Sequence, residues 1–418
     1  MKKLNVVPWG ELFNKKISVV ESILDLEEPT VAIGNQNSYG DVILPYSNYG
    51  IAIPDSKNEN DGFITSKETI ENFIHRTNTL LYGIPGKGNV TIGGAIASDV
   101  HGKDNLWGGS FSKNVDQISI ILASNEIITA SETVNSDVFF ATLGGYGLTG
   151  IITSALLKTN EIKYSSNFLT NYITGSGIED LISSFHSQQN TYWVAWVDLL
   201  KKQKDWVIEE SRPSEGNQKN VDIANQRPFK LSIPFIGLNR FASMRIINSI
   251  FYHSKKLTRE KRNNIFEVLH PLSRWTDTKN ISKNRKIIQI QFSIPDKNKH
   301  SLDYLLNILI NKQSPLLCSV KRLDIKTNES NLSFIQDGWT AAIDFPADSF
   351  NYKEIRIFYR KLTELEGKVY LAKDSTLNKD EFMNMYPDYH SWSKIVRKID
   401  PNNIFQSELS KRLGLKQW

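Results

Sequence analysis

The feature that most constrains the fold of this chain is a glycine-rich segment at residues 84–103, which reads IPGKGNVTIGGAIASDVHGK. Glycine, alanine and serine carry little side chain, so the backbone N–H groups of such a segment stay open to a ligand. A pyrophosphate group needs many hydrogen-bond donors and little bulk around it. The segment therefore favours a nucleotide-binding loop. The alternative is a set of tight turns between strands.

The loop belongs to neither of the two familiar nucleotide-binding types. It does not read GxGxxG at the start of a Rossmann helix, and the chain contains no GxxxxGK followed by serine or threonine. A different class of nucleotide-binding fold is therefore expected.

The size and composition of the chain indicate a globular protein of two domains. A chain of 418 residues is too long for one ordinary core, and 40% hydrophobic with 23% charged residues is typical of folded domains. The formal net charge of +5 does not indicate a nucleic-acid partner. It would suit a phosphorylated substrate or an anionic membrane face.

Cysteine usage and hydropathy limit the compartment and the cofactors. Cys318 is the only cysteine, which excludes an internal disulfide and argues against a thiolate metal cluster. No set of His, Cys, Asp and Glu has metal-ligand spacing, so we expect no metal. The N-terminus lacks the apolar stretch of a secretory signal, and no apolar window is long enough for a transmembrane segment. We expect a cytoplasmic protein, with a peripheral contact at the inner membrane face left open.

Hydrophobic periodicity predicts an α+β organisation. From about residue 165 glycine becomes rarer and aromatic and basic residues increase, which indicates a second domain with an antiparallel sheet. The pattern predicts strand, turn and strand at 31–53, helices at 65–80, 242–257, 300–312 and 381–399, strands at 193–200, 286–294 and 340–345, and a strand and turn at 368–375.

Several motifs resemble one flavoprotein family. The segment at 84–103 is similar to the pyrophosphate-binding region of the vanillyl-alcohol-oxidase superfamily, which has a PCMH-type FAD-binding domain, and the loop ATLGGYGLTGII at 141–152 is similar to its second flavin-contacting loop. The ending ASDVHGK at 97–103 resembles specifically the decaprenylphosphoryl-ribose 2'-oxidase group of that superfamily. DGWTAAIDFP at 337–346, YLAKDSTL at 370–377 and DPNNIFQSELSKRLGL at 400–415 resemble later segments of its decaprenylphosphoryl-ribose 2'-oxidase group. The matches keep their order over nearly the whole chain.

This resemblance implies a fold and an activity. The fold is α+β, with a discontinuous FAD-binding domain of residues 1–165 completed by 368–418, and an antiparallel-sheet substrate domain at 166–367. The activity is FAD-dependent oxidation of a secondary hydroxyl of a sugar to a ketone. The sugar is expected to be a glycosyl phosphate or to be linked to a lipid or nucleotide. Oxidases of this group work with a short-chain reductase to epimerise a sugar, so such a reductase is the expected partner.

Two other functions remain open at this point. An aldonolactone or alditol oxidase of the same superfamily usually carries an HWGK-like C-terminal motif, where this chain has LAKDS. A non-catalytic protein could instead bind anions or lipid through a basic cluster, although a solvated helix end would have the same composition. That cluster comprises Lys255, Lys256, Arg259, Lys261 and Arg262.

The first loop of the family usually reads close to RGLGRSYGD, and here it reads IGNQNSYGD at 33–41. Some relatives attach the flavin through a histidine just before the serine, where this chain has Asn37. Because asparagine cannot form that bond, we expect non-covalent FAD. The resemblance implies that the following residues bind the cofactor: Gly34, Ser38, Tyr39, Gly40, Asp41, Pro85, Gly86, Gly93, Gly94, Ala95, Ile96, Ser98, Asp99, His101, Gly102, Gly145, Gly147, Thr149, Gly150, Ile152, Tyr370 and Ala372.

The resemblance also implies that Lys373 in YLAKDS is an active-site lysine beside the flavin, with Tyr39 and His101 as the other catalytic candidates. A cation there can orient the hydroxyl or stabilise an alkoxide, and a lysine with a lowered pKa can act as a base. Ala342 stands where some relatives have a reactive cysteine. The expected substrate contacts are Lys103, Gln289, Gln291, Arg322 and Lys373. The two glutamines share one side of a strand, and a plain half-exposed strand would look the same.

Overall fold

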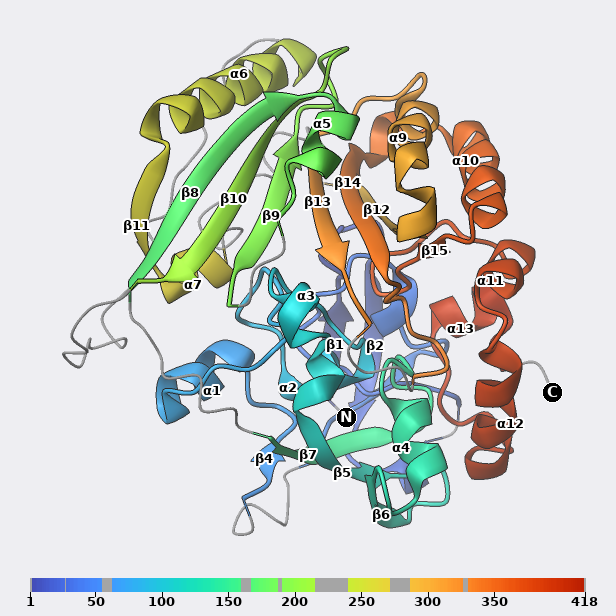
Figure 1. Ribbon diagram of the computed structural model, residues 1–418. Coiled ribbons are helices and arrows are strands. Elements are labelled where there is room, and N and C mark those ends of the chain that lie inside the picture. Colours follow the sequence, from blue (N-terminus) through green and yellow to red (C-terminus); the bar gives the residue numbers. More distant parts are fainter. Residues whose placement is uncertain are drawn as a thin grey trace.

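A computed structural model describes residues 2–26, 28–54, 62–158, 167–186, 190–214, 240–270, 286–325 and 330–416. Within these ranges the strands form three sheets, with helices on both faces of the largest one (Figure 1).

The largest sheet has eight strands, and every neighbouring pair is antiparallel. Its order is β11 (Glu260–Asn264), β8 (Asn167–Ser176), β10 (Asp205–Pro213), β9 (Tyr192–Val197), β13 (Leu317–Leu323), β14 (Gly338–Pro346), β12 (Ile287–Pro295) and β15 (Lys368–Val369). The antiparallel sheet is therefore confirmed, as are the strands predicted at 193–200, 286–294 and 340–345.

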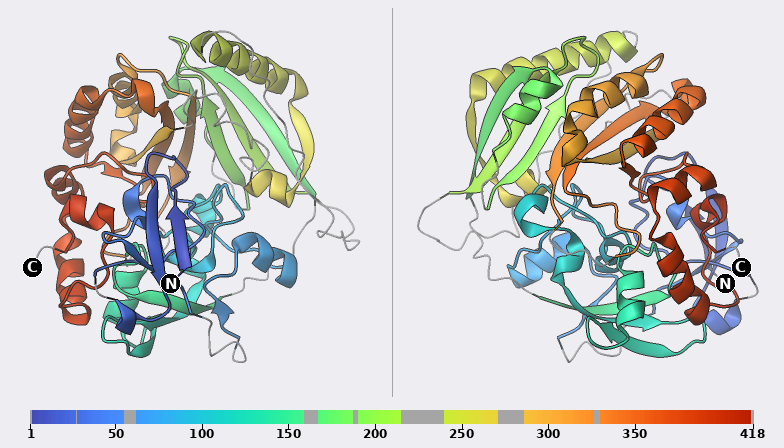
Figure 2. Two further views of the ribbon diagram at one scale, coloured as in Figure 1. Left: turned by 180° about the vertical axis from the view of Figure 1, so that it is seen from behind. Right: turned by 45° about the vertical axis from the view of Figure 1, so that its right-hand side comes forward.

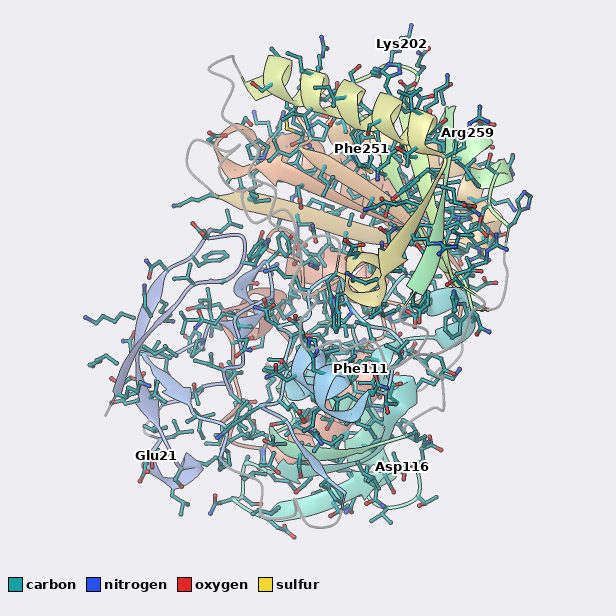
Figure 3. The ribbon with its side chains drawn as sticks, turned by 90° about the vertical axis from the view of Figure 1, so that its left-hand side faces the viewer. Glu21, Phe111, Asp116, Lys202, Phe251 and Arg259 are labelled. Carbon is teal, nitrogen blue, oxygen red and sulfur yellow. The ribbon has the colours of Figure 1, made fainter. Side chains whose placement is uncertain are left out.

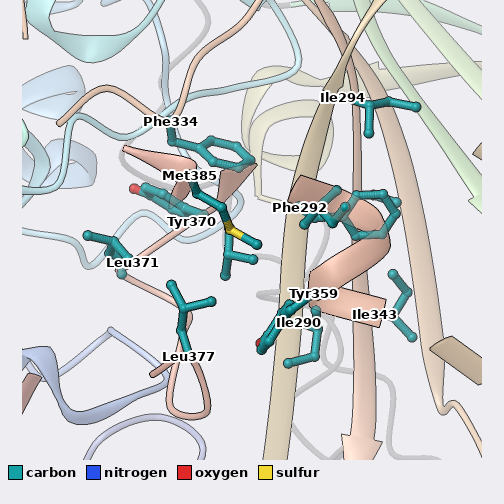
Figure 4. Close-up of a cluster of buried hydrophobic side chains, with 14 of the residues drawn as sticks. Ile290, Phe292, Ile294, Phe334, Ile343, Tyr359, Tyr370, Leu371, Leu377 and Met385 are labelled. Carbon is teal, nitrogen blue, oxygen red and sulfur yellow. The ribbon is translucent and has the colours of Figure 1, made fainter. Parts of the chain in front are cut away.

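The two faces of this sheet differ because side chains alternate along each strand. In β12, Ile290, Phe292 and Ile294 point into the main hydrophobic core, where all three are fully buried (Figure 4). Gln289 and Gln291 point the other way. The core face is covered by α5 (Ile178–Ser183), α9 (Leu302–Ile310) and α10 (Tyr352–Glu364), and α6 (Arg240–Thr258) lies on the opposite face (Figure 2).

The remaining strands and helices surround the glycine-rich segments. A four-stranded sheet has the order β4 (Ile64–Thr65), β7 (Ile151–Leu157), β5 (Val115–Ile121) and β6 (Ile127–Ser131), and a three-stranded sheet comprises β1 (Lys2–Val6), β2 (Lys15–Val20) and β3 (Tyr49–Ile51). The helices here are α1 (Ile70–Thr77), α2 (Ile92–Ala97), α3 (Asn105–Gly108) and α4 (Ser136–Thr142), with α7 (Ile265–Leu269) after β11.

The C-terminal helices return to this first part of the chain. They are α11 (Lys379–Met385), α12 (Tyr389–Ile399) and α13 (Glu408–Leu413). Trp392 of α12 donates a hydrogen bond to the carbonyl of Ala141 in α4 at 3.0 Å, and Thr30 forms a bridge with Phe405. The last 50 residues therefore pack against the first 150, as a discontinuous domain would require.

Some predicted elements differ from the structure. In the predicted strand, turn and strand at 31–53, only β3 forms a strand. Ala32 and Pro45 make single bridges to Ile51 and Ser407, and the loop at 34–39 lines a cavity. The predicted helix at 65–80 is shorter, since Thr69 caps α1 and Asn78 ends it with φ of 55°. The helix predicted at 381–399 is two helices, because Pro387 keeps Tyr386 out of the helical conformation.

Candidate active site

A cavity of about 350 Å³ lies between the large sheet, the loops at 34–39 and 84–87, and the turn at 370–373. Three parts of the chain that are far apart in sequence meet there. One wall is bare backbone and apolar side chains, and another is polar.

The first wall carries little side-chain bulk. Gly34, Gly86, Gly93 and Gly94 line it, together with Gly147. At Gly147 the backbone is left-handed, with φ of 74°, and a Cβ atom there would meet nothing within 4 Å. This wall fits a flavin nucleotide, because a pyrophosphate can approach bare backbone closely. Apolar side chains that could face the rings also line the cavity: Val31, Ala32, Val42, Ile43 and Ile152.

The second wall is the polar face of three strands. Gln289 and Gln291 of β12, Lys321 of β13 and Asp344 of β14 project from it into the cavity. Gln289 Nε2 donates to Asp344 Oδ1 at 2.6 Å. Gln291 Nε2 donates to Thr340 Oγ1 at 3.2 Å. These amides are already held in place, which suits groups that must orient a polar ligand.

His101, near the end of the glycine-rich segment, contacts this polar wall. Its Nε2 lies 2.9 Å from Gln291 Nε2, and its Nδ1 lies 3.0 Å from Lys321 Nζ. Burial keeps the pKa of His101 well below its usual value, and the charges of Lys321 and Lys373 lower it further. The imidazole is therefore neutral at pH 7. Burial likewise lowers the pKa of Lys321 to about 7.

Lys373 lies in the turn that follows β15, and its Nζ is 4.0 Å from the centre of the Tyr39 ring. Burial lowers the pKa of Lys373, and the nearby carboxylate of Asp344 opposes that shift. Burial raises the pKa of Asp344. The amine of Lys373 can therefore lose its proton at a lower pH than an exposed lysine can.

Below the cavity, Arg412 of α13 joins the two segments that carry Tyr39 and Lys373. Its Nε and Nη2 each lie 2.8 Å from a carboxylate oxygen of Asp41, and its Nη1 lies 2.9 Å from Asp374. A Cβ atom on Gly40 would meet the carbonyl oxygen of Asp374 at 1.7 Å, so only glycine allows this approach. Tyr39 and Lys373 are thus positioned as one unit.

The structure brings most of the expected site residues together. Those that line the cavity are Gly34, Ser38, Tyr39, Pro85, Gly86, Gly93, Gly94, Ser98, His101, Gly102, Lys103, Gly147, Gly150, Ile152, Gln289, Gln291, Tyr370, Ala372 and Lys373. Those that do not are Gly40, Asp41, Ala95, Ile96, Asp99, Gly145, Thr149 and Arg322.

Arg322 needs a correction, because it points to the other face of β13. Its Nη2 lies 2.6 Å from Asp337 Oδ1, and its Nη1 donates to the carbonyl of Gly338 at 2.6 Å. Since side chains alternate along a strand, the neighbouring Lys321 faces the cavity instead. We therefore replace Arg322 by Lys321 in the candidate site. Asp41 was expected to bind the cofactor, but it lies outside the cavity lining and forms an ion pair with Arg412 instead.

Sequence reasoning missed Lys321 and Asp344. No strand was predicted at 317–323, so there was no basis for deciding which of its side chains lie on the same face of the sheet. Asp344 follows Ala342 at a spacing of two in a predicted strand, which was a usable signal, since both residues line the cavity. Ala342 offers no thiol there, and Cys318 is buried on the opposite face of the sheet.

Comparison with known proteins shows what the chain is similar to. Residues 262–413 match the D-arabinono-1,4-lactone oxidase family. The chain is 29% identical over 351 residues to decaprenylphosphoryl-β-D-ribose oxidase of Mycolicibacterium smegmatis, covering 79% of this chain and 75% of that protein. It is 24% identical over 366 residues to an uncharacterised Streptomyces coelicolor protein, covering 79% and 95% of the two chains. It is 38% identical over 90 residues to cytokinin dehydrogenase 4 of Oryza sativa subsp. japonica, covering 20% and 16%.

Proposed function

The chain belongs to the FAD-dependent oxidoreductases of the vanillyl-alcohol-oxidase superfamily that act on CH–OH groups, and from this premise we propose that it oxidises a secondary hydroxyl of a phosphate-bearing sugar to a ketone. The observation that carries the proposal is the meeting of Lys103, Lys321 and Lys373 with Gln289 and Gln291 in one cavity. Amides suit sugar hydroxyls, and half-buried lysines suit an anionic group. The phosphate carries a lipid or a nucleotide.

The residues of the cavity have separate roles in the proposed reaction. When bound, FAD supplies the acceptor for the hydride that leaves the carbinol carbon. Lys373 Nζ takes the hydroxyl proton, for which its lowered pKa prepares it. Gln289 and Gln291 orient the hydroxyl groups. Lys321 and Lys103 hold the phosphate, and Lys103 lies 3.4 Å from Glu209, which keeps its amine near the cavity edge.

Product analysis and substitution together test this proposal. Incubation with phosphorylated sugars, followed by reduction with borodeuteride, should give a product one deuterium heavier, as a ketone requires. Lys103→Ala and Lys321→Ala should each raise KM for the phosphorylated sugar about 10- to 100-fold, because each removes a charge-assisted bond. Arg322→Ala is the matched control and should leave KM unchanged, since its guanidinium lies on the other face. Equal KM values for phosphorylated and free sugars would contradict the proposal.

A second candidate is an aldonolactone or alditol oxidase, which the lactone-oxidase match at 262–413 favours. A neutral lactone would offer no phosphate for Lys103 and Lys321 to bind. If free aldonolactones or alditols are turned over with a kcat/KM equal to that of phosphorylated sugars, this second function would be favoured over the first.

The proposal extends to domain organisation and to a partner. We assign the flavin to residues 1–165 with 368–418 and the sugar to 166–367. The keto sugar is consumed by a short-chain reductase, and together the two steps invert the carbinol carbon. Accumulation of the keto sugar in the presence of such a reductase and its nicotinamide cofactor would argue against the partner.

A further inference from the structure

The surface helix α6 carries positive charge without any negative charge. Its sequence, RFASMRIINSIFYHSKKLT, contains four arginines and lysines and no aspartate or glutamate over 19 residues. A helix of this composition suits contact with an anionic surface.

The outer face of α6 is apolar as well as basic. Ile246 is 40% exposed, Ile250 is 64% exposed and Leu257 is 85% exposed. Spacings of four and seven residues place these three side chains on one stripe of a helix. His253 is exposed in the same stripe, and the exposed Arg245 and Lys256 flank it. We call Ile246, Ile250 and Leu257 the outer stripe.

The outer stripe is exposed although α6 itself is firmly packed on the sheet. On the inner face Met244 is buried, and Asn248 Nδ2 donates to Asp198 Oδ1 at 2.7 Å. Phe251 packs on Trp196 with ring centres 5.0 Å apart. Figure 3 shows α6 along the rim of the molecule, with Phe251 beneath it and Arg259 after its end. The helix is therefore fixed by its inner face, which leaves the outer stripe for a partner.

The surroundings of the outer stripe add positive charge. Lys202 and Arg259 are exposed near the helix (Figure 3). Arg262 and the acid Glu260 are exposed on β11, which follows the helix in the chain. Lys255 instead points inward, with its amine 3.9 Å from the Tyr172 ring centre. Apolar side chains between basic ones are typical of helices that lie in a membrane interface.

We propose that α6 docks through its outer stripe on an anionic lipid surface. No helix in the described ranges is long and apolar enough to cross a membrane. On its inner side α6 packs with Tyr39 through Met244, on the sheet face that carries Gln289. The helix that docks is therefore packed on the sheet face that lines the cavity. This deepens the proposed function, on which it rests only for the nature of the substrate, which would be a lipid-linked sugar.

Co-sedimentation of the full-length protein with vesicles tests the docking without any substrate. Phosphatidylcholine vesicles containing phosphatidylglycerol should bind the protein, and pure phosphatidylcholine vesicles should bind it about tenfold more weakly or worse. The double variants Ile250→Asp/Leu257→Asp and Arg245→Glu/Lys256→Glu should each lose about tenfold in affinity for the anionic vesicles. Leu24→Asp is the matched control, because Leu24 is 75% exposed on another part of the surface, and it should bind like the parent.

The outcomes separate docking from catalysis. Both α6 variants should bind FAD and oxidise a water-soluble sugar phosphate at the parental rate, which also shows that they are folded. Equal binding to both kinds of vesicle, or parental binding by both α6 variants, would overturn the docking and point to a protein partner for the stripe. If the proposed substrate is wrong, turnover fails in parent and variants alike, while vesicle binding still follows the outer stripe.

Discussion

Lys373 lines the cavity where the polar wall meets the glycine-lined wall, and its amine lies over the Tyr39 ring. A group that takes a proton as charge develops stabilises the transition state more than the ground state, so its loss should appear in the chemical step. Lys373→Ala should slow flavin reduction at saturating substrate by about 10²- to 10³-fold. Stopped-flow absorbance under anaerobic conditions measures this step alone.

The same variant should keep its cofactor and its fold. Burial lowers the pKa of Lys373, which means that its charged form is disfavoured in the folded protein, so removing it should not lower the melting temperature. Lys373→Arg should also be slow, because a guanidinium does not give up its proton. Parental reduction rates in Lys373→Ala would move the catalytic role to His101 or Tyr39.

The pH dependence of flavin reduction has a predicted sign. A base must be neutral before it can accept a proton, and the pKa of Lys373 is lowered by burial. The limiting rate should therefore rise as pH increases through that lowered pKa and level off above it. His101 should add no further step above pH 6, because its pKa lies well below its usual value. In Lys373→Ala the rising limb should vanish, and its persistence would show that another group titrates.

At the scale of elements, the Asp41–Arg412–Asp374 ion-pair cluster ties α13 to the segments that carry Tyr39 and Lys373. Arg412→Met would leave two buried carboxylates without their partner, which should cost about 3–5 kcal/mol of unfolding free energy. It should also slow flavin reduction, because Tyr39 and Lys373 lose their shared support. Urea unfolding measures the first effect. Lys411→Met, the adjacent exposed residue whose amine lies 5.2 Å from the Tyr46 ring centre, should change stability by less than about 0.5 kcal/mol. An Arg412→Met protein as stable as the parent would contradict this role.

Elements with strong periodicity could be predicted from the sequence, and their faces with them. Alternation in β12 placed Gln289 and Gln291 on one side, where the structure has them. The segment LCSVKRL of β13 places a lysine and an arginine side by side, so a shift of one residue exchanges Lys321 for Arg322. The segments beside the loop at 33–41 have strand-like sequences, but the backbone of the loop itself turns around the cavity. Tertiary contacts determine such a turn, so the local sequence did not predict it.

At the scale of the whole molecule, the cavity exists only because distant segments return to each other. Thr30 pairs with Phe405, Pro45 pairs with Ser407, and the Lys416 amine donates to the carbonyl of Leu148 at 3.0 Å. Local patterns carry no information on such contacts. The order of the family motifs alone indicated that residues 400–415 belong with the first domain.

The assembled cavity predicts how the cofactor is held. Asn37 lines the cavity and donates to the carbonyl of Asn89 at 3.0 Å, so no histidine stands at the position where some relatives attach the flavin. FAD should therefore be bound without a covalent link. Precipitation with acid should leave all yellow colour in the supernatant. Flavin retained in the washed pellet would show that FAD is covalently attached.

We propose that this flavoprotein takes a hydride from a sugar that bears a phosphate. Anaerobic mixing of the purified enzyme with a phosphorylated sugar and, separately, with its free counterpart tests this claim in a single turnover. The phosphorylated sugar should bleach the flavin and yield one keto sugar per flavin. The free sugar at the same concentration should bleach it at least about tenfold more slowly. Equal bleaching by the two sugars, or bleaching by free aldonolactones alone, would contradict it.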